Sequence, residues 1–177
     1  MSDAKNLKEA ILWCGQAMSD MEVGRIVFGH QKWSYACFLS QQSSEKSLKA
    51  LYYFLDRDIE RRHGLSELFK GLPEETQKAL GSLHDDLLIL DQYYLPTRYP
   101  DALGTGNLPS ESYTRKQAED SLASARKVLE ATLFLTNITI KGINDPPIGG
   151  DPPMSPLPIS GQDLPSVEDD TETPGPK

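Results

Sequence analysis

The distribution of proline divides this chain of 177 residues into two parts. Nine of its 13 prolines follow Asp145, in a stretch where no apolar period survives. Because proline lacks a backbone donor, this stretch can form neither a continuous helix nor a strand ladder. Its composition is typical of a disordered segment. We therefore predict one folded domain over residues 1–142 and a disordered, Pro-rich acidic tail over residues 143–177.

The tail also carries most of the negative charge. From Asp145 onward there are seven acids against the single Lys177, whereas the formal net charge of the whole chain is −8 at pH 7. The folded part is therefore nearly neutral, which argues against a broad phosphate-binding surface but allows a local basic pocket. The first residues are charged and lack a long apolar run. We expect neither a signal peptide nor a membrane span, and a cytoplasmic location.

Apolar residues in the body recur every three or four positions, which is the period of an amphipathic helix. In the first helix they are Leu7, Ile11, Cys14, Met18 and Met21. No segment shows convincing apolar alternation, and we interpret the β-branched run at 136–140 as a fraying helix end. We predict an all-α fold, an up-and-down bundle of four long helices plus a short one. The long helices cover about 3–30, 32–56, 73–95 and the region from 114 onward, and the short one covers 63–72.

Small polar residues fill the middle of the second helix, where serine stands at positions 40, 43, 44 and 47. Short side chains let a neighbouring helix approach closely, so we expect this helix to be central in the bundle. The same helix carries Gln41, Glu45 and Lys46. At this spacing they either face solvent or line a polar pocket between helices.

The chain contains no P-loop, GxGxxG turn, nucleophile elbow or HExxH helix. Cys14 and Cys37 lie among apolar neighbours without a CxxC spacing, so we expect buried thiols. The histidines stand in separate segments, and none adjoins an obvious nucleophile. These patterns predict no catalytic residue, no metal and no cofactor. His63, which opens the short helix, either bonds to local backbone or serves as a base or ligand near the end of the bundle.

The stretch YYLPTRYPDALGTGNLPSESYT, residues 93–114, interrupts the helical pattern with turn-forming residues but also carries tyrosines and an arginine. Asp91 and Tyr94 are three positions apart on one helix and share a face, and Arg98 follows one turn later. Arg98 can satisfy the last carbonyls of the helix or pair with Asp91, and it can equally hold a phosphate with its guanidinium fork. With a phosphate bound, Tyr94 and Tyr99 offer ring faces on which a base can stack.

Four segments occur in the order ACFLSQQSSEKSLKALYYFL, HGLSELF, DQYYLPTRYPDA and YTRKQAEDSLASARKVLE, within roughly residues 5–137. The Gln-Gln-x-x-Glu-Lys helix and the Arg-Tyr-Pro-Asp turn are the most specific of these features. In this order and spacing the chain resembles the HEPN domain family, found in prokaryotes and at the C-terminal end of the chaperone sacsin. The pair after Gln42 is usually alanine in that family and is Ser43 and Ser44 here.

The resemblance implies a bundle of about five helices that commonly dimerises, often beside a small nucleotidyltransferase subunit. Some members are metal-independent ribonucleases that use an arginine and a histidine four to six residues apart at the end of the fourth long helix. Here Arg98 is followed by YPDALGTGN, without a histidine. Two other pairs, Arg25 with His30 and Arg57 with His63, have the spacing of the ribonuclease motif. Neither lies at the end of the fourth long helix, so we treat both as coincidence.

Three hypotheses follow from the residues and the resemblance together. The leading one is a non-enzymatic homodimer that binds a nucleotide or another anion near the Arg-Tyr-Pro turn, with a nucleotidyltransferase partner. The second is a ribonuclease toxin restrained by a nucleotidyltransferase antitoxin. The third is an assembly partner without a ligand. The homodimer is expected because one short core does not use all the apolar surface, and two-fold pairing commonly covers it.

Deleting the tail from about Asp145 is expected to leave the melting temperature nearly unchanged, because its composition cannot bury enough apolar surface to offset the entropy of ordering it. Thermal melts of the full and shortened chains measure this. A drop of more than about 5 °C, on the order of 1 kcal/mol for a domain of this size, would show that the tail packs on the body.

Overall fold

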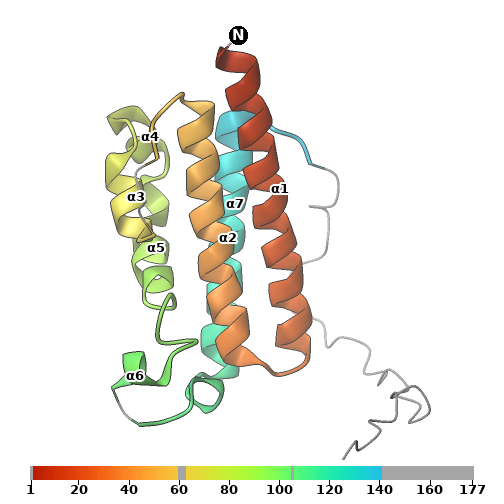
Figure 1. The fold of residues 1–177 in the computed structure, drawn as a ribbon, viewed down its shortest axis with the longest axis vertical. Helices are drawn as coiled ribbons and strands as arrows, with labels where there is room; N and C mark the ends of the chain where they lie inside the picture. The colour runs from red at the N-terminus through yellow and green to blue at the C-terminus, as the bar shows by residue number, and fades with distance from the viewer. Residues whose placement is uncertain (1, 60–62, 105, 141–177) are drawn as a thin grey trace, which may run out of the picture.

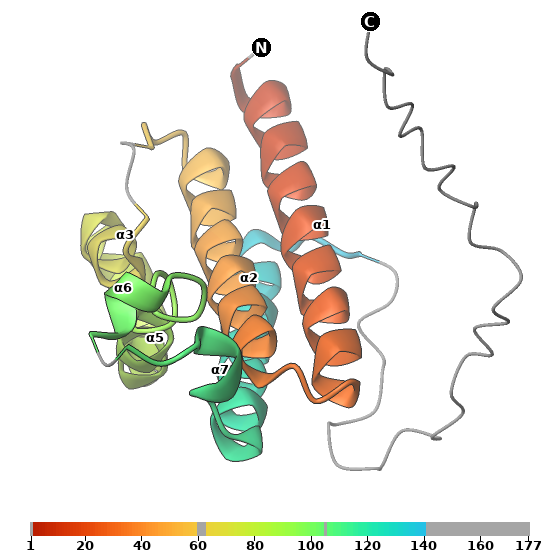
Figure 2. The same ribbon diagram turned by 60° about the horizontal axis from the view of Figure 1, so that its bottom comes forward.

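The structure, a computed structural model, describes residues 2–59, 63–104 and 106–140. Three long helices lie side by side along the molecule, α1 (Ser2–Gly29), α2 (Trp33–Phe54) and α7 (Arg115–Thr136) (Figure 1). Short helices lie on the other side of α2 from α1, as Figure 2 also shows. They are α3 (Leu65–Gly71), α4 (Glu74–Ala79) and α5 (His84–Asp91), followed by α6 (Pro100–Leu103) at one end of the bundle. Two short 3-10 turns, η1 (Gly81–Leu83) and η2 (Pro109–Glu111), complete the order.

The described residues contain helices and no strand, so the predicted all-α fold is confirmed. The predicted tail from residue 143 lies outside the described residues. Within the ranges that the structure describes, none of the helices combines the length and the apolar character needed to cross a membrane.

The serines of α2 allow the close packing that places this helix at the centre. Ser40, Ser43, Ser44 and Ser47 are all fully buried. Ser43 Oγ donates to the carbonyl of Ala17 on α1 at 2.8 Å, and the other three hydroxyls donate to carbonyls one turn earlier in α2. Each hydroxyl is therefore satisfied without a bulky side chain between the helices, and the expected central position is confirmed.

The face that α1 turns toward the bundle consists mainly of its smallest residues. Ala10, Cys14 and Ala17 are fully buried, and a Cβ at Gly24 would lie 3.1 Å from Leu122 Cδ2 of α7. By contrast, Leu7 and Ile11 have exposed fractions of 43% and 45%. The periodicity correctly predicted the helix, but it did not show which face the close packing would select.

The segment predicted as one long helix at 73–95 is divided in the structure into α4, η1 and α5. The division falls at Gly81 and Ser82, which are weaker helix formers than their neighbours. The apolar stripe nevertheless survives the break, because the leucines at positions 80, 83, 87 and 90 are all buried. The hydrophobic period thus predicted the buried positions better than it predicted helix continuity.

The end of α7 also differs from the expectation of a fraying helix. Asn137 adopts a left-handed conformation with φ 52° and ends the helix at Thr136. Asparagine tolerates this conformation better than most residues, which explains a defined stop. Ile138 then packs into a cluster with residues of α1 and α7 and is 8% exposed. The run therefore contributes Ile138 to the core and is not a frayed helix end.

Candidate functional site

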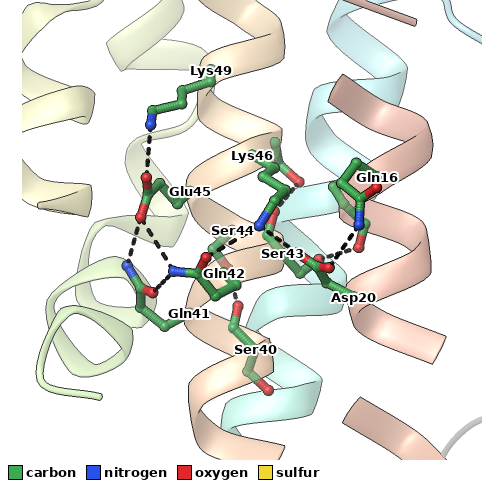
Figure 3. A network of polar contacts seen from close by, with 12 residues as sticks. Gln16, Asp20, Ser40, Gln41, Gln42, Ser43, Ser44, Glu45, Lys46 and Lys49 are labelled. Carbon is green, nitrogen blue, oxygen red and sulfur yellow. Dashed lines mark hydrogen bonds and ion pairs between the residues drawn. The ribbon is translucent and has the colours of Figure 1, made fainter. Parts of the chain in front are cut away.

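A buried carboxylate on α2 organises the polar residues of this site. Glu45 is 5% exposed and points toward the α3 and α5 side of the helix (Figure 3). Its oxygens lie near Lys49 Nζ at 2.7 Å, His63 Nδ1 at 3.1 Å, Gln41 Nε2 at 3.2 Å and Gln42 Nε2 at 3.5 Å. Burial by itself raises the pKa of Glu45, but the hydrogen bonds from Lys49 and His63 and the Lys49 charge together outweigh it. The pKa therefore lies below its ordinary value, and Glu45 is ionised at neutral pH.

This ionised carboxylate also fixes which ring nitrogen of His63 carries the proton. Because a carboxylate can only accept, Nδ1 of His63 carries the proton in their contact. In the neutral imidazole the other ring nitrogen, Nε2, is then an acceptor and a proton site. The His63 side chain is 55% exposed, and Gln41 Nε2 lies 3.4 Å from the His63 carbonyl oxygen. Glu45 thus holds an exposed imidazole in one tautomer, and Gln41 contacts the backbone of the same residue.

Asp91 at the end of α5 holds the segment that carries His63. Its carboxylate accepts from the backbone amides of Leu65 at 2.8 Å and Ser66 at 3.2 Å, and from Ser66 Oγ at 2.9 Å. These donors belong to the first turn of α3, whose amides have no partner within the helix. Asp91 therefore fastens the start of α3, immediately after His63, to α5.

Aromatic rings surround the Arg98 guanidinium. Its Cζ atom lies 4.3 Å from the ring centre of Phe38, 4.9 Å from that of Tyr94 and 5.0 Å from that of Tyr99. Arg98 Nε donates to the Tyr94 carbonyl at 3.1 Å. The Tyr94 ring also stacks on His63, with centroids 5.8 Å apart and planes inclined by 9°. One tyrosine thus contacts both the histidine and the arginine.

Most of the residues singled out from the sequence come together here, but two have other roles. Gln41, Glu45, His63, Tyr94, Arg98 and Tyr99 are linked by the contacts above. Lys46 points instead toward α1, where it pairs with Asp20 at 2.6 Å (Figure 3). Asp91 caps α3, and Arg98 has no carboxylate partner among the described residues, so their predicted pairing is wrong. Arg98 does contact a backbone carbonyl, but it is that of Tyr94, in the turn after α5 rather than in the last turn of the helix.

Sequence reasoning missed Phe38 and Lys49. Both lie on α2 at helical spacing from residues that it found, three positions before Gln41 and four after Glu45. That spacing was a usable signal, because such residues share a helix face. Phe38 was overlooked because an aromatic residue in an amphipathic helix ordinarily belongs to the core.

The described residues offer little for metal or thiol chemistry. No group of three or more His, Cys, Asp or Glu side chains in this part of the chain is placed to hold a metal ion. Cys14 and Cys37 are buried, and burial raises the pKa of each thiol to about 11. Both thiols are therefore protonated and unreactive at neutral pH.

Comparison with known proteins agrees with the fold. Residues 10–135, well over half of the chain, match the HEPN domain. This chain belongs to the HEPN domain family. The resemblance inferred from its sequence is thereby confirmed, whereas the likeness to the domain of sacsin stays a prediction.

Individual HEPN relatives are similar over most of their length. A protein of Methanocaldococcus jannaschii named putative toxin MJ1304 is 31% identical over 133 residues, which are 71% of this chain and 86% of the relative. The crystal structure of TT1696 from Thermus thermophilus has a TM-score of 0.66 and 32% identity, covering 70% of this chain and 95% of that one. The crystal structure of ST0689, described as an archaeal HEPN homologue, has a TM-score of 0.60 and 30% identity, covering 72% and 98% respectively.

Replacing Glu45 by alanine is expected to lower the free energy of unfolding by about 3–5 kcal/mol, because Lys49 is left buried without its counter-charge. The matched control is Glu74→Ala. It removes an exposed partner of Lys78 at the same i, i+4 spacing and is expected to cost about 0.5 kcal/mol or less. Urea unfolding of the three proteins measures both changes.

The ionisation of Glu45 also makes the stability of the folded protein depend on pH. Because the folded-state pKa of Glu45 is lowered, its contribution to stability is present at neutral pH and is lost as the pH falls below the ordinary carboxylate range. Glu45→Gln lacks this ionisation, so its stability should fall less steeply with acid than that of the wild type. Parallel curves for the two proteins below about pH 5 would contradict the assignment of an ionised Glu45.

Proposed function

We propose that this HEPN protein is a non-catalytic, homodimeric module that binds a nucleotide or another anion at Arg98, and that it acts with a nucleotidyltransferase partner. The observation that supports the ligand proposal is the set of contacts that the Arg98 guanidinium makes. Three rings contact it and its Nε is bonded to a carbonyl, but its terminal nitrogens have no acceptor among the described residues.

This arrangement suits an anion because of its chemistry and its rigidity. A guanidinium presents a planar fork of N–H donors that matches two oxygens of a phosphate or a carboxylate. Packing among Phe38, Tyr94 and Tyr99 limits the rotamers of Arg98 before a ligand arrives, which lowers the entropy lost on binding. The His63 ring stacks on Tyr94, which brings a second polar side chain to the same tyrosine.

The same packing changes which part of a nucleotide carries the affinity. Arg98 already contacts the rings of Tyr94 and Tyr99, and His63 stacks on Tyr94. A base therefore has less free ring surface than the sequence suggested. We infer that the phosphate groups, rather than the base, provide most of the binding energy.

The partner proposal has a different basis. The M. jannaschii relative is named a putative toxin. The family resemblance implies that such a toxin is paired with an antitoxin. The assignment of that partner as a nucleotidyltransferase rests on the family resemblance and on no contact described here.

Arg98→Ala is expected to weaken binding of ATP, GTP and inorganic pyrophosphate by roughly 10- to 100-fold, because it removes charge-assisted hydrogen bonds worth about 1.5–3 kcal/mol. Arg98→Lys should restore the charge but not the fork, and so recover binding only in part. Arg126→Ala is the matched control, since Arg126 lies on α7 and pairs there with Glu130. Calorimetric titration gives the affinities and thermal melts give the stabilities.

The melts separate a ligand site from a structural arginine. Loss of contacts with three rings is expected to cost on the order of 1 kcal/mol, a small change beside the loss of affinity. If the wild type binds none of the three probes at millimolar concentration while Arg98→Ala unfolds early, Arg98 is structural and the ligand proposal fails.

A second candidate, a metal-independent ribonuclease toxin, is favoured by the contact of Glu45 with His63. A carboxylate that orients an imidazole is a usual arrangement for acid–base catalysis, and Arg98 lies on the same tyrosine. His63 Nε2 would take the proton of a ribose 2′-hydroxyl, whose oxygen attacks the phosphorus. The bond to the 5′-oxygen breaks, and that oxygen takes a proton from solvent water, which yields a 2′,3′-cyclic phosphate and a 5′-hydroxyl.

Bulk RNA incubated with the protein in EDTA tests this second function. A ribonuclease of this kind would leave cyclic phosphate ends, and both His63→Ala and Arg98→Ala would abolish cleavage because the acid–base group or the charge stabilisation is lost. His84→Ala is the control, since that ring packs against Phe69 instead. Intact RNA at micromolar wild-type protein would exclude the ribonuclease and leave the binding module.

A further inference from the structure

The outer face of α1 carries large apolar side chains that no other part of the described chain covers. In both views α1 lies at the edge of the bundle, away from α3 and α5 (Figures 1 and 2). Its small residues face inward, and five large ones are between 43% and 57% exposed: Leu7, Ile11, Leu12, Val23 and Ile26. Single exposed apolar residues are ordinary, but five on one helix indicate a contact surface.

Gly15 lies in the middle of this face and has no explanation within the chain. Glycine inside a helix costs about 1 kcal/mol relative to alanine and therefore normally has a packing reason. Gly24 has one, because a Cβ there would press on Leu122 of α7. A Cβ at Gly15 would meet nothing within 4 Å. Close approach of another molecule at Gly15 would supply the missing reason.

Lys8 and Glu22, the two charges one heptad from Gly15 on either side, complement one another only in an antiparallel pair of helices. Lys8 lies seven residues before Gly15 and Glu22 seven residues after it, on the same face, and both are exposed. Neither has an ion-pair partner among the described residues. When two α1 helices run antiparallel and cross at Gly15, Lys8 of each lies opposite Glu22 of the other. A parallel pair would place like charges together.

We propose that two copies of this protein pair through α1, antiparallel, with the two-fold axis at Gly15. The proposal rests on the proposed homodimer and names its interface. The same register brings Leu12 level with Met18 and Leu7 level with Val23, so apolar residues line both edges of the seam. Lys5 and Arg25 are also level with each other, but they lie on opposite edges. A two-fold contact repeats each pair, which gives two Lys8–Glu22 ion pairs for one interface.

A disulfide at the axis tests the crossing point directly. In the full chain, Gly15→Cys places two thiols next to each other across the two-fold axis, so mild oxidation is expected to give a covalent dimer. The natural Cys14 and Cys37 are buried and do not compete. The matched control is Gly81→Cys, at an exposed glycine whose Cβ also meets nothing within 4 Å. The control is expected to stay largely unlinked on a denaturing gel.

Charge reversal tests the orientation. Lys8→Glu and Glu22→Lys each place like charges opposite one another twice, and each is expected to weaken dimerisation by roughly fivefold or more at low salt. The double reversal restores both pairs and should return the dissociation constant to within about twofold of wild type, since the pairs regain opposite charges. Sedimentation and light scattering give the association state of each variant.

The outcomes distinguish a failure of the α1 interface from a failure of the homodimer proposal. A wild type that remains a 19.7 kDa monomer at micromolar concentration overturns both the homodimer and the α1 interface. In that case the exposed face of α1 is covered by another segment or another protein, or by nothing. A wild-type dimer with neither Gly15→Cys cross-linking nor any effect of charge reversal overturns the α1 interface and keeps the homodimer. Cross-linking together with rescue by the double reversal supports the interface.

Discussion

The close packing of α2 against its neighbours is the constraint on which the rest of the structure depends. Four buried serines let α1 and α7 approach α2, and their hydroxyls bond to backbone carbonyls, so the approach leaves no buried serine donor unsatisfied. This proximity selects the small-residue face of α1, which turns Leu7 and Ile11 outward. The exposed surface that we assign to a second copy is thus a consequence of the same packing.

The opposite side of α2 has a different chemistry, because Glu45 is buried there as an anion. An isolated buried charge is costly, and Glu45 is stabilised by donors from Lys49, His63 and Gln41. Those donors fix the segment before α3, and Asp91 fixes the start of α3 itself. Together they bring His63 to Tyr94, and Tyr94 to Arg98. The site therefore depends on a charge that need not contact the ligand.

Membership in the HEPN family accounts for the fold more fully than for the function. In this chain no histidine follows Arg98 closely, and the histidine that shares a tyrosine with it comes from a segment more than thirty residues earlier. Anion binding and RNA cleavage both use this arrangement, but only cleavage needs proton transfer by His63. The ligand site and the dimer contact are also separate in these proposals, because the ligand site lies on one side of α2 and the dimer contact is the outer face of α1, which packs on the other side.

The sequence by itself determined the all-α class, the three long helices α1, α2 and α7, the central place of α2 and the buried leucine stripe, because these follow from local periodicity and side-chain size. It did not show that the segment at 73–95 breaks into shorter helices. It also indicated Glu45, His63, Tyr94 and Arg98, through unusual polar and aromatic residues in helical or turn contexts. Only the tertiary structure decided that Asp91 caps α3, that Lys46 turns to α1 and that Gly15 faces outward. These depend on which face of each helix packs and on contacts between segments far apart in the chain, which local spacing does not encode.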